Sequence, residues 1–292
     1  MSDNDIGDNV STGRLVETLF GLVEERVQDE EVVSSEDEEN GFDEGGLDLS
    51  QADLPLAPVD FYAPKIITQE KIQDLIPFLD ELSLFENQWG FVKKSETREN
   101  WCLWARAQAV PILEHLTDLC IQNQLIQPRA LYSYVHCAVQ DETLYLYKPD
   151  KKEVFLEMDF PRLKNGTCLT DKIVEKEAEL FDTIAVIAVN LGRGISETGK
   201  SWLASGKKDE YAYLNGFALE MLNAMTRYTA SLITDEGCCL GNTVFLGDSK
   251  QASAKVQSAL VDMLNASLID ITFSRNYLMM PEYSSLALVL PR

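Results

Sequence analysis

Few residues in this chain have the type and spacing that metal binding or catalysis requires. The sequence has 292 residues but only two histidines, His115 and His136, and each stands alone in its stretch. Neither His-x-x-x-His nor Cys-x-x-Cys occurs among the histidines and the six cysteines, so we predict no metal site. A lone histidine is more often structural than catalytic, and the residues by themselves identify no reaction and no catalytic residue.

Two other patterns could carry chemistry, but each also has a structural interpretation. Cys238 and Cys239 are adjacent, and adjacent cysteines rarely close a disulfide because the geometry distorts the peptide, so we expect free thiols. Gly192-Arg193-Gly194 follows an apolar run and precedes a helical pattern, which is a suitable place for phosphate binding. The rest of the dinucleotide and Walker fingerprints is missing, and a tight strand-to-helix turn also explains both glycines.

The composition restricts the possible partners. The chain holds 48 acidic and 25 basic residues, and its net charge of −23 argues against binding to nucleic acid or to an anionic membrane. No apolar run approaches the roughly 20 residues that cross a bilayer, and the N-terminus lacks the pattern of a signal peptide. The scattered cysteines fit reduced thiols, so we expect a cytoplasmic protein.

Most of the negative charge lies in the first 60 residues, which contain 18 acidic and two basic residues. We predict that residues 1–55 form an acidic, largely disordered segment, because the run from 29 to 50 cannot bury enough apolar surface to order itself. Within this segment, residues 12–28 have apolar side chains at helical spacing and predict a short amphipathic helix. This helix could dock into a groove on a partner, or it could pack on its own protein or fray.

Residues 56–292 are predicted to form the folded domain. Helical periodicity predicts helices over 69–85, 96–126, 196–204, 210–233 and 251–265, with a kink or restart at Pro111. β-type composition predicts strands over 130–139, 143–147, 153–158, 183–190, 269–273 and 285–290. Helices and strands interleave, but a hairpin around the turn at 148–152 and the closing strands favour an α+β fold over a doubly wound parallel sheet.

Several motifs in this domain resemble the activation domain of cobalamin-dependent methionine synthase. They occur in the family's order: LD at 79–80, LFENQWGF at 84–91, IQPRALYSY at 126–134, FPR at 160–162, TCLTD at 167–171 and YLMMPE at 277–282. The resemblance implies a C-shaped α+β single domain with an antiparallel sheet flanked by helices. It also implies a shallow groove that binds S-adenosylmethionine, and docking over a cobalamin domain for reductive methylation of the cobalamin.

One motif of the family is missing. The family holds the methionine part of S-adenosylmethionine with the arginine and backbone of R-P-A-P-G-Y, whereas residues 237–248 contain neither the arginine nor Gly-Tyr. A helix glutamate that some members use toward the ligand aligns with Asn223, on a flank with Glu220 and Arg227 that we expect to face away from the core. Of the family's ligand-contacting acids only Asp80 carries over, either as a contact to a ligand ammonium group or as a charge at a helix end. We therefore expect S-adenosylmethionine to bind weakly or not at all.

The resemblance leads to two hypotheses about function. In the first, the chain is a stand-alone accessory subunit of a methyltransferase system that presents S-adenosylmethionine to a separate cobalamin-binding methionine synthase protein. In this hypothesis the chain contacts cobalamin only through this partner. No homocysteine, folate or cobalamin domain is recognisable, so the chain alone is not a complete methionine synthase. In the second hypothesis, it is a non-enzymatic binding or scaffold module that kept the fold, lost the ligand site and recruits partners through its acidic N-terminal segment.

Overall fold

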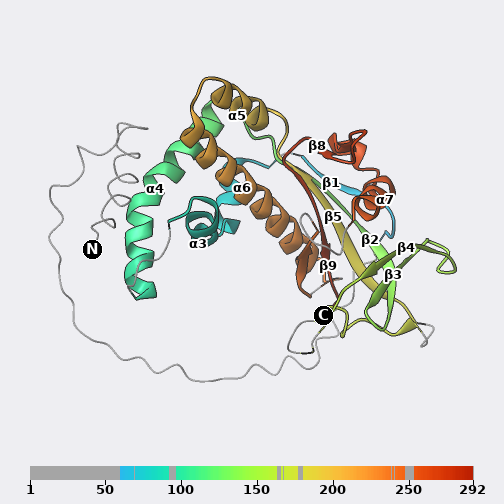
Figure 1. Ribbon diagram of the computed structural model, residues 1–292. Coiled ribbons are helices and arrows are strands. Elements are labelled where there is room, and N and C mark those ends of the chain that lie inside the picture. Colours follow the sequence, from blue (N-terminus) through green and yellow to red (C-terminus); the bar gives the residue numbers. More distant parts are fainter. Residues whose placement is uncertain are drawn as a thin grey trace, which may run out of the picture. The chain divides into compact units, whose positions relative to one another are not determined.

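The fold is built around a seven-stranded antiparallel sheet (Figure 1). The computed structural model describes residues 60–291 except 69, 92–96, 163–165, 167, 177–179, 238, 240 and 247–252. The predicted acidic segment at 1–55, its helix at 12–28 and the start of the folded domain at Leu56 lie outside the described residues.

Six of the strands follow the order β4-β3-β2-β5-β9-β6 across the sheet, and β1 pairs with the first part of β2. A separate two-stranded sheet joins β7 and β8. The strands are β1 (Lys65–Ile67), β2 (Arg129–Gln140), β3 (Thr143–Tyr147), β4 (Val154–Asp159), β5 (Asp182–Asn190), β6 (Thr243–Phe245), β7 (Thr272–Phe273), β8 (Met279–Met280) and β9 (Ser284–Val289).

The helical segments lie on the two faces of this sheet and beside it. They are α2 (Ile72–Leu75), the 3-10 turn η1 (Ile76–Phe78), α3 (Glu81–Ser83), the π-helical turn η2 (Leu84–Gln88), α4 (Arg98–Gln122), α5 (Gly194–Ala204), α6 (Lys208–Asp235), α7 (Ala254–Leu264) and the 3-10 turn η4 (Ala266–Ile269). Among these helices, none combines the length and the apolar character that crossing a membrane requires.

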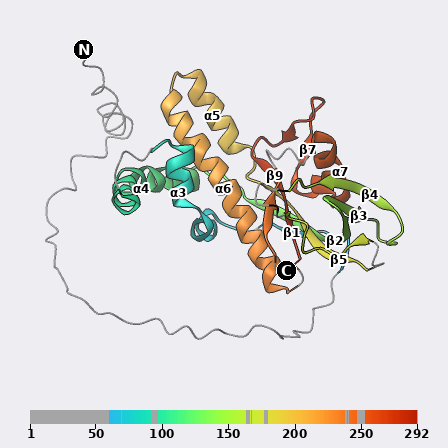
Figure 2. The same cartoon turned by 60° about the horizontal axis from the view of Figure 1, so that its bottom comes forward.

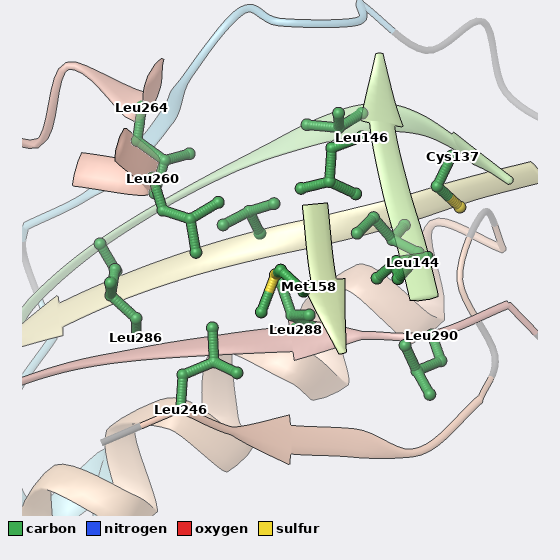
Figure 3. Close-up of a cluster of buried hydrophobic side chains, with 14 of the residues drawn as sticks. Cys137, Leu144, Leu146, Met158, Leu246, Leu260, Leu264, Leu286, Leu288 and Leu290 are labelled. Carbon is green, nitrogen blue, oxygen red and sulfur yellow. The ribbon is translucent and has the colours of Figure 1, made fainter. Parts of the chain in front are cut away.

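Both faces of the central strands are covered, which explains the unbroken apolar sequence of β5. On one face, Ile184 and Val186 of β5 belong to a buried cluster that includes Leu260 and Leu264 of α7 (Figure 3). On the other face, α6 contacts β5, β2 and β9. Because side chains alternate along a strand, each strand residue packs against one of these two layers.

Helix α6 connects the sheet to the remaining helices. It packs against α5, which lies beside it in both views, and it also contacts α2, α4, η1 and η2 (Figure 2). Trp89, directly after η2, donates a hydrogen bond from Nε1 to the Tyr213 carbonyl at 3.0 Å. A Cβ atom on Gly216 would come within 3.0 Å of the Trp89 ring, so α6 needs glycine at this close contact. Residues on several sides of α6 are therefore buried.

The α+β class with an antiparallel sheet is confirmed, as are most of the long elements. The strands predicted over 130–139, 143–147, 153–158, 183–190 and 285–290 correspond to β2, β3, β4, β5 and β9. The hairpin around 148–152 is present, since β3 and β4 pair antiparallel. The helices predicted over 196–204 and 210–233 correspond to α5 and α6, and that predicted over 251–265 corresponds to α7, which begins after the Ser253 N-cap.

Three predictions about local structure were wrong. The single helix over 69–85 is replaced by four short segments, because the chain is extended at Leu79 and Asp80 caps a new turn. The helix over 96–126 is shorter than predicted, because α4 ends at Gln122, and it does not restart at Pro111 but continues through it with Pro111 on the exposed side, while a kink at Pro111 stays a prediction. The strand over 269–273 shrinks to Thr272–Phe273, because a 3-10 turn occupies the preceding residues.

Candidate functional site

A groove of about 900 Å³ lies where α6 meets the C-terminal strands. Leu219 and Leu222 of α6, Phe245 of β6 and Met279 of β8 give it an apolar wall. Leu278 and Met280 add to the apolar lining, and the polar lining consists of amide and hydroxyl groups with one lysine and one glutamate: Gln88, Asn223, Gln257, Ser284, Ser285, Lys200 and Glu282. A concave site with apolar walls and a few polar groups is typical of binding sites for small organic ligands.

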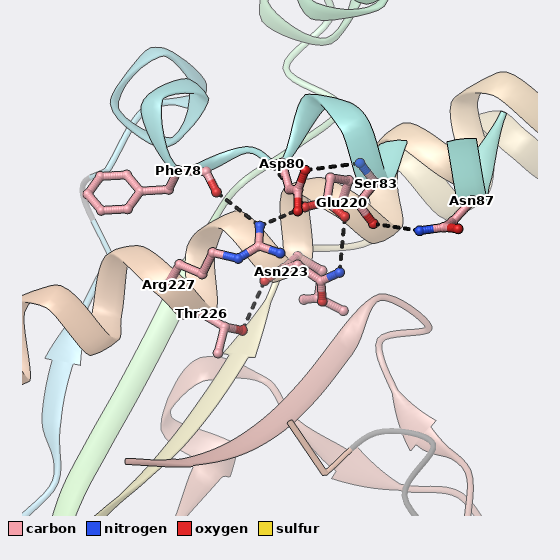
Figure 4. A network of polar contacts seen from close by, with 9 residues as sticks. Phe78, Asp80, Ser83, Asn87, Glu220, Asn223, Thr226 and Arg227 are labelled. Atoms are coloured by element: carbon pink, nitrogen blue, oxygen red, sulfur yellow. Dashed lines mark hydrogen bonds and ion pairs between the residues drawn. The ribbon is translucent and has the colours of Figure 1, made fainter. Parts of the chain in front are cut away.

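A buried polar network lies behind the groove on α6 (Figure 4). Glu220 is fully buried, and Arg227 donates from Nη1 to its Oε1 at 2.6 Å. The backbone N–H of Asp80 donates to the same oxygen at 3.2 Å, and Asn223 Nδ2 donates to Oε2 at 3.2 Å. Arg227 Nη1 also donates to the Phe78 carbonyl at 3.0 Å. The network thus satisfies both oxygens of the Glu220 carboxylate and ties the turn at 78–80 to α6.

The expectation that this flank of α6 faces away from the core was wrong for Glu220. The turn at 78–80 covers the flank, so Glu220 is buried, and one of its three hydrogen-bond partners, the Asp80 N–H, comes from a distant part of the chain. Asn223, which the alignment placed at the family's helix glutamate, does line the groove. The carboxylate next to Asn223 belongs to Glu220, one helical turn earlier, and it is buried. The groove is therefore lined by the Asn223 amide and not by a glutamate at this position.

Asp80 lies beside this network, and its carboxylate serves the backbone. Its Oδ1 accepts a hydrogen bond from the Ser83 N–H at 3.0 Å, which makes Asp80 the N-cap of α3. This contact agrees with the interpretation of Asp80 as a helix-end charge. Its backbone N–H positions the Glu220 carboxylate, so Asp80 is linked to the groove through Glu220 and Asn223. A direct contact between Asp80 and a ligand stays a prediction.

The segment that replaces the family's arginine motif forms an edge strand. β6 pairs with β9, and Gly241 approaches the backbone so closely that a Cβ atom there would lie 2.0 Å from the Pro291 carbonyl oxygen. Phe245 extends from β6 into the groove wall. The guanidinium of Arg227 lies 6.0 Å from the centre of the Phe245 ring, within cation–π range. An arginine therefore does lie beside this strand, but α6 supplies it.

A second polar cluster lines the groove where α5 meets the segment between β8 and β9. Ser196 Oγ donates to Glu282 Oε2 at 2.5 Å, and Lys200 Nζ lies 3.0 Å from both of these oxygens. The hydrogen bond from Ser196, assisted by Lys200, lowers the pKa of Glu282. Glu282 is therefore a carboxylate at neutral pH. The one local sequence signal for this cluster is the i, i+4 spacing of Ser196 and Lys200, which places them on one helix face, whereas Glu282 is distant along the chain.

The other candidates from the sequence have structural surroundings. His136 is buried and stacks on Phe61 with ring centroids 3.8 Å apart, and burial, assisted by nearby Lys151, lowers its pKa to about 4. Cys239 is buried and its thiol donates to the Thr183 carbonyl at 3.4 Å, while Cys238 lies outside the described residues. His115 lies half-buried in α4. Within the part of the chain that the structure describes, no group of His, Cys, Asp and Glu is arranged to hold a metal ion.

The glycines at 192 and 194 form a close-packed turn. Gly192 has φ +78° and its N–H donates to the Asn190 side chain at 2.9 Å. A Cβ atom on Gly194 would lie 2.8 Å from the Leu125 carbonyl oxygen. Backbone conformation and close packing therefore account for both glycines, since the strand-to-helix junction packs against Leu125 and Gln127 in the segment that follows α4.

Comparisons with known proteins agree with the resemblance seen in the motifs. No family model matches the chain. It is 23% identical over 214 residues to the methionine synthase of Mycobacterium leprae, and 22% identical over 212 residues to that of Mycobacterium tuberculosis. These matches cover 70% and 69% of this chain but only 18% of each methionine synthase.

A solved structure supports the same conclusion at the level of the fold. The crystal structure of the MetH reactivation domain bound to AdoHcy (S-adenosylhomocysteine) matches with a TM-score of 0.60 and 13% identity. The match covers 79% of this chain and 78% of that one. Sequence and fold together show that the chain is a divergent protein that resembles the activation domain of methionine synthase.

Proposed function

We propose that this domain binds S-adenosylmethionine in the groove beside α6 and presents it to a cobalamin-carrying partner for reductive methylation. The groove carries this proposal, because its size and lining suit a nucleoside joined to an amino acid through sulfur. The similar MetH reactivation domain is bound to AdoHcy, which differs from S-adenosylmethionine by one methyl group. S-adenosylmethionine would be a substrate here: after an external one-electron reductant converts the partner's cob(II)alamin to cob(I)alamin, the cobalt would take the methyl group from the sulfonium, and S-adenosylhomocysteine would be the leaving group.

The lining residues offer contacts for the ligand's chemically different parts. The Phe245 ring provides an aromatic face on which a purine can stack. Because Asn223 Nδ2 donates to Glu220, its Oδ1 is left to accept a hydrogen bond from a ligand donor such as the purine amino group. Leu219 and Met279 provide the apolar surface along which the thioether chain packs. The buried Glu220–Arg227 network supports Asn223 from behind.

Exposed apolar side chains next to the groove support the presentation role. Leu278 and Met280 line the groove but are 64% and 39% exposed, and adjacent Tyr277 is 63% exposed. Exposed large apolar side chains that gather at a binding groove are typical of a docking surface. We propose that the partner's cobalamin-binding module covers this rim, which brings the cobalt to the sulfonium and excludes water from the methyl transfer.

Calorimetric titration with S-adenosylhomocysteine tests the proposal. We expect saturable binding at a single site, and Asn223→Ala should weaken it about threefold to tenfold because one neutral hydrogen bond is lost. Asn123→Ala is the matched control, since Asn123 caps the end of α4 and does not line the groove. Binding in Asn123→Ala should equal that of the wild type. Failure of the wild-type protein to bind the nucleoside would contradict the proposed function.

A second experiment tests the presentation role. The wild-type protein, S-adenosylmethionine and a chemical reductant are mixed with the cobalamin-binding module of a methionine synthase, loaded with cob(II)alamin. We expect the visible spectrum of methylcobalamin to appear only when the protein is present. Replacing Tyr277 with Asp should slow its appearance while leaving S-adenosylhomocysteine binding within about twofold, because Tyr277 is exposed beside the groove and does not line it. Equal rates with and without the protein would refute the presentation role.

A further inference from the structure

Among the residues that the structure describes, the side chains of Ser196, Lys200 and Glu282 have hydrogen bonds and ion pairs only with one another in this cluster. Lys200 and Glu282 form an ion pair at 3.0 Å, and their side chains are 66% and 46% exposed. Both line the groove, so a bound ligand can reach both charges. Ser196 is only 7% exposed and lies between them, in hydrogen-bond contact with each.

We infer that Lys200 and Glu282 bind the α-amino-acid end of the ligand, with Lys200 facing its carboxylate and Glu282 facing its ammonium group. This inference rests on the proposed function and names the residues that take over from the family's missing arginine. An α-amino acid carries its carboxylate and ammonium on one carbon. The two ligand charges are therefore about as close together as the Lys200 and Glu282 charges, so the ligand can pair with both at once.

The surroundings of the pair fit this role better than a role in stability alone. A surface ion pair with both partners this exposed contributes little to folding stability, so stability gives little reason for it. Charge-assisted hydrogen bonds to a ligand carboxylate or ammonium are stronger than neutral ones, and the groove wall removes part of the surrounding water. Ser196 acts as a positioning residue, because its hydroxyl holds the Glu282 carboxylate while it accepts from Lys200.

Ligands with and without the amino-acid end separate this inference from the proposed function. S-adenosylhomocysteine carries the α-amino acid, whereas 5′-methylthioadenosine keeps the nucleoside and the sulfur but lacks it. Each is titrated by calorimetry into the wild-type protein, Lys200→Gln and Glu282→Gln. Arg106→Gln is the matched control, because Arg106 forms a comparable surface pair with Glu81 at 3.2 Å and does not line the groove.

We expect Lys200→Gln and Glu282→Gln each to weaken S-adenosylhomocysteine binding at least about tenfold. Methylthioadenosine binding should change less than about twofold in both variants, and Arg106→Gln should bind both compounds as the wild type does. Equal binding of S-adenosylhomocysteine by the wild type and by both groove variants would overturn the inference and leave the proposed function intact. If neither S-adenosylhomocysteine nor methylthioadenosine binds to the wild type, both the inference and the proposed function are overturned.

Discussion

The buried ion pair between Glu220 and Arg227 leads to a strong prediction about stability. Glu220 is fully buried in the wild type, and in Arg227→Met it loses the guanidinium that lies 2.6 Å from its Oε1. Removing one partner of a buried ion pair costs about 3–5 kcal/mol, because the remaining charge is not compensated. The Phe78 carbonyl also loses its donor, which costs about 1 kcal/mol.

Partial exposure of Arg227 reduces this cost. Its side chain is 33% exposed, so water can enter the space that the shorter methionine leaves and solvate Glu220. We therefore expect Arg227→Met to lower the free energy of unfolding by about 3 kcal/mol, the lower end of the range for buried pairs. Urea unfolding followed by far-ultraviolet circular dichroism measures this loss.

Two further variants make the test specific. Arg106→Met removes the exposed partner of Glu81 and should cost less than about 1 kcal/mol. Adding Glu220→Gln to Arg227→Met removes the uncompensated charge, so the double variant should be more stable than Arg227→Met by at least about 1 kcal/mol. Equal losses in Arg227→Met and Arg106→Met, or a double variant less stable than Arg227→Met, would refute this reasoning.

Two other predictions concern single positions. Burial, assisted by Lys151, lowers the pKa of His136 to about 4, so between pH 6.5 and 4 the unfolded chain binds a proton that the folded protein does not. Stability should fall by about 1–3 kcal/mol as the pH drops through this interval, and unfolding curves of His136→Phe should show a smaller drop. Gly194→Ala should destabilise the protein by about 1–3 kcal/mol in urea, because its Cβ would meet the Leu125 carbonyl oxygen at 2.8 Å; an unchanged midpoint would contradict the close packing.

The long elements could be predicted from sequence because their patterns depend on neighbours within each element. β5 is apolar along its length since both of its faces are covered, and α6 shows helical spacing over several turns. The region 69–85 has the same apolar spacing as a helix, but its extended residue at Leu79 and the Asp80 cap divide it. The strands β6 and β8 contain three and two residues, too few for any periodicity.

The candidate site was harder to predict because it joins residues that are distant along the chain. Resemblance to the family identified Asp80 and the position of Asn223, but the burial of Glu220 depends on a turn 140 residues earlier. In the same way, Ser196 and Glu282 are 86 residues apart. Such contacts depend on how α5, α6 and the C-terminal strands pack, and no local pattern in the sequence encodes this packing.

A crystal structure of the protein with S-adenosylhomocysteine would test the central claim most directly. We predict electron density for the nucleoside in the groove between α6 and the C-terminal strands, with its amino-acid end within hydrogen-bond distance of Lys200 and Glu282. Density for the nucleoside at another place, such as the smaller groove beside Thr68 and Arg129, would contradict the account.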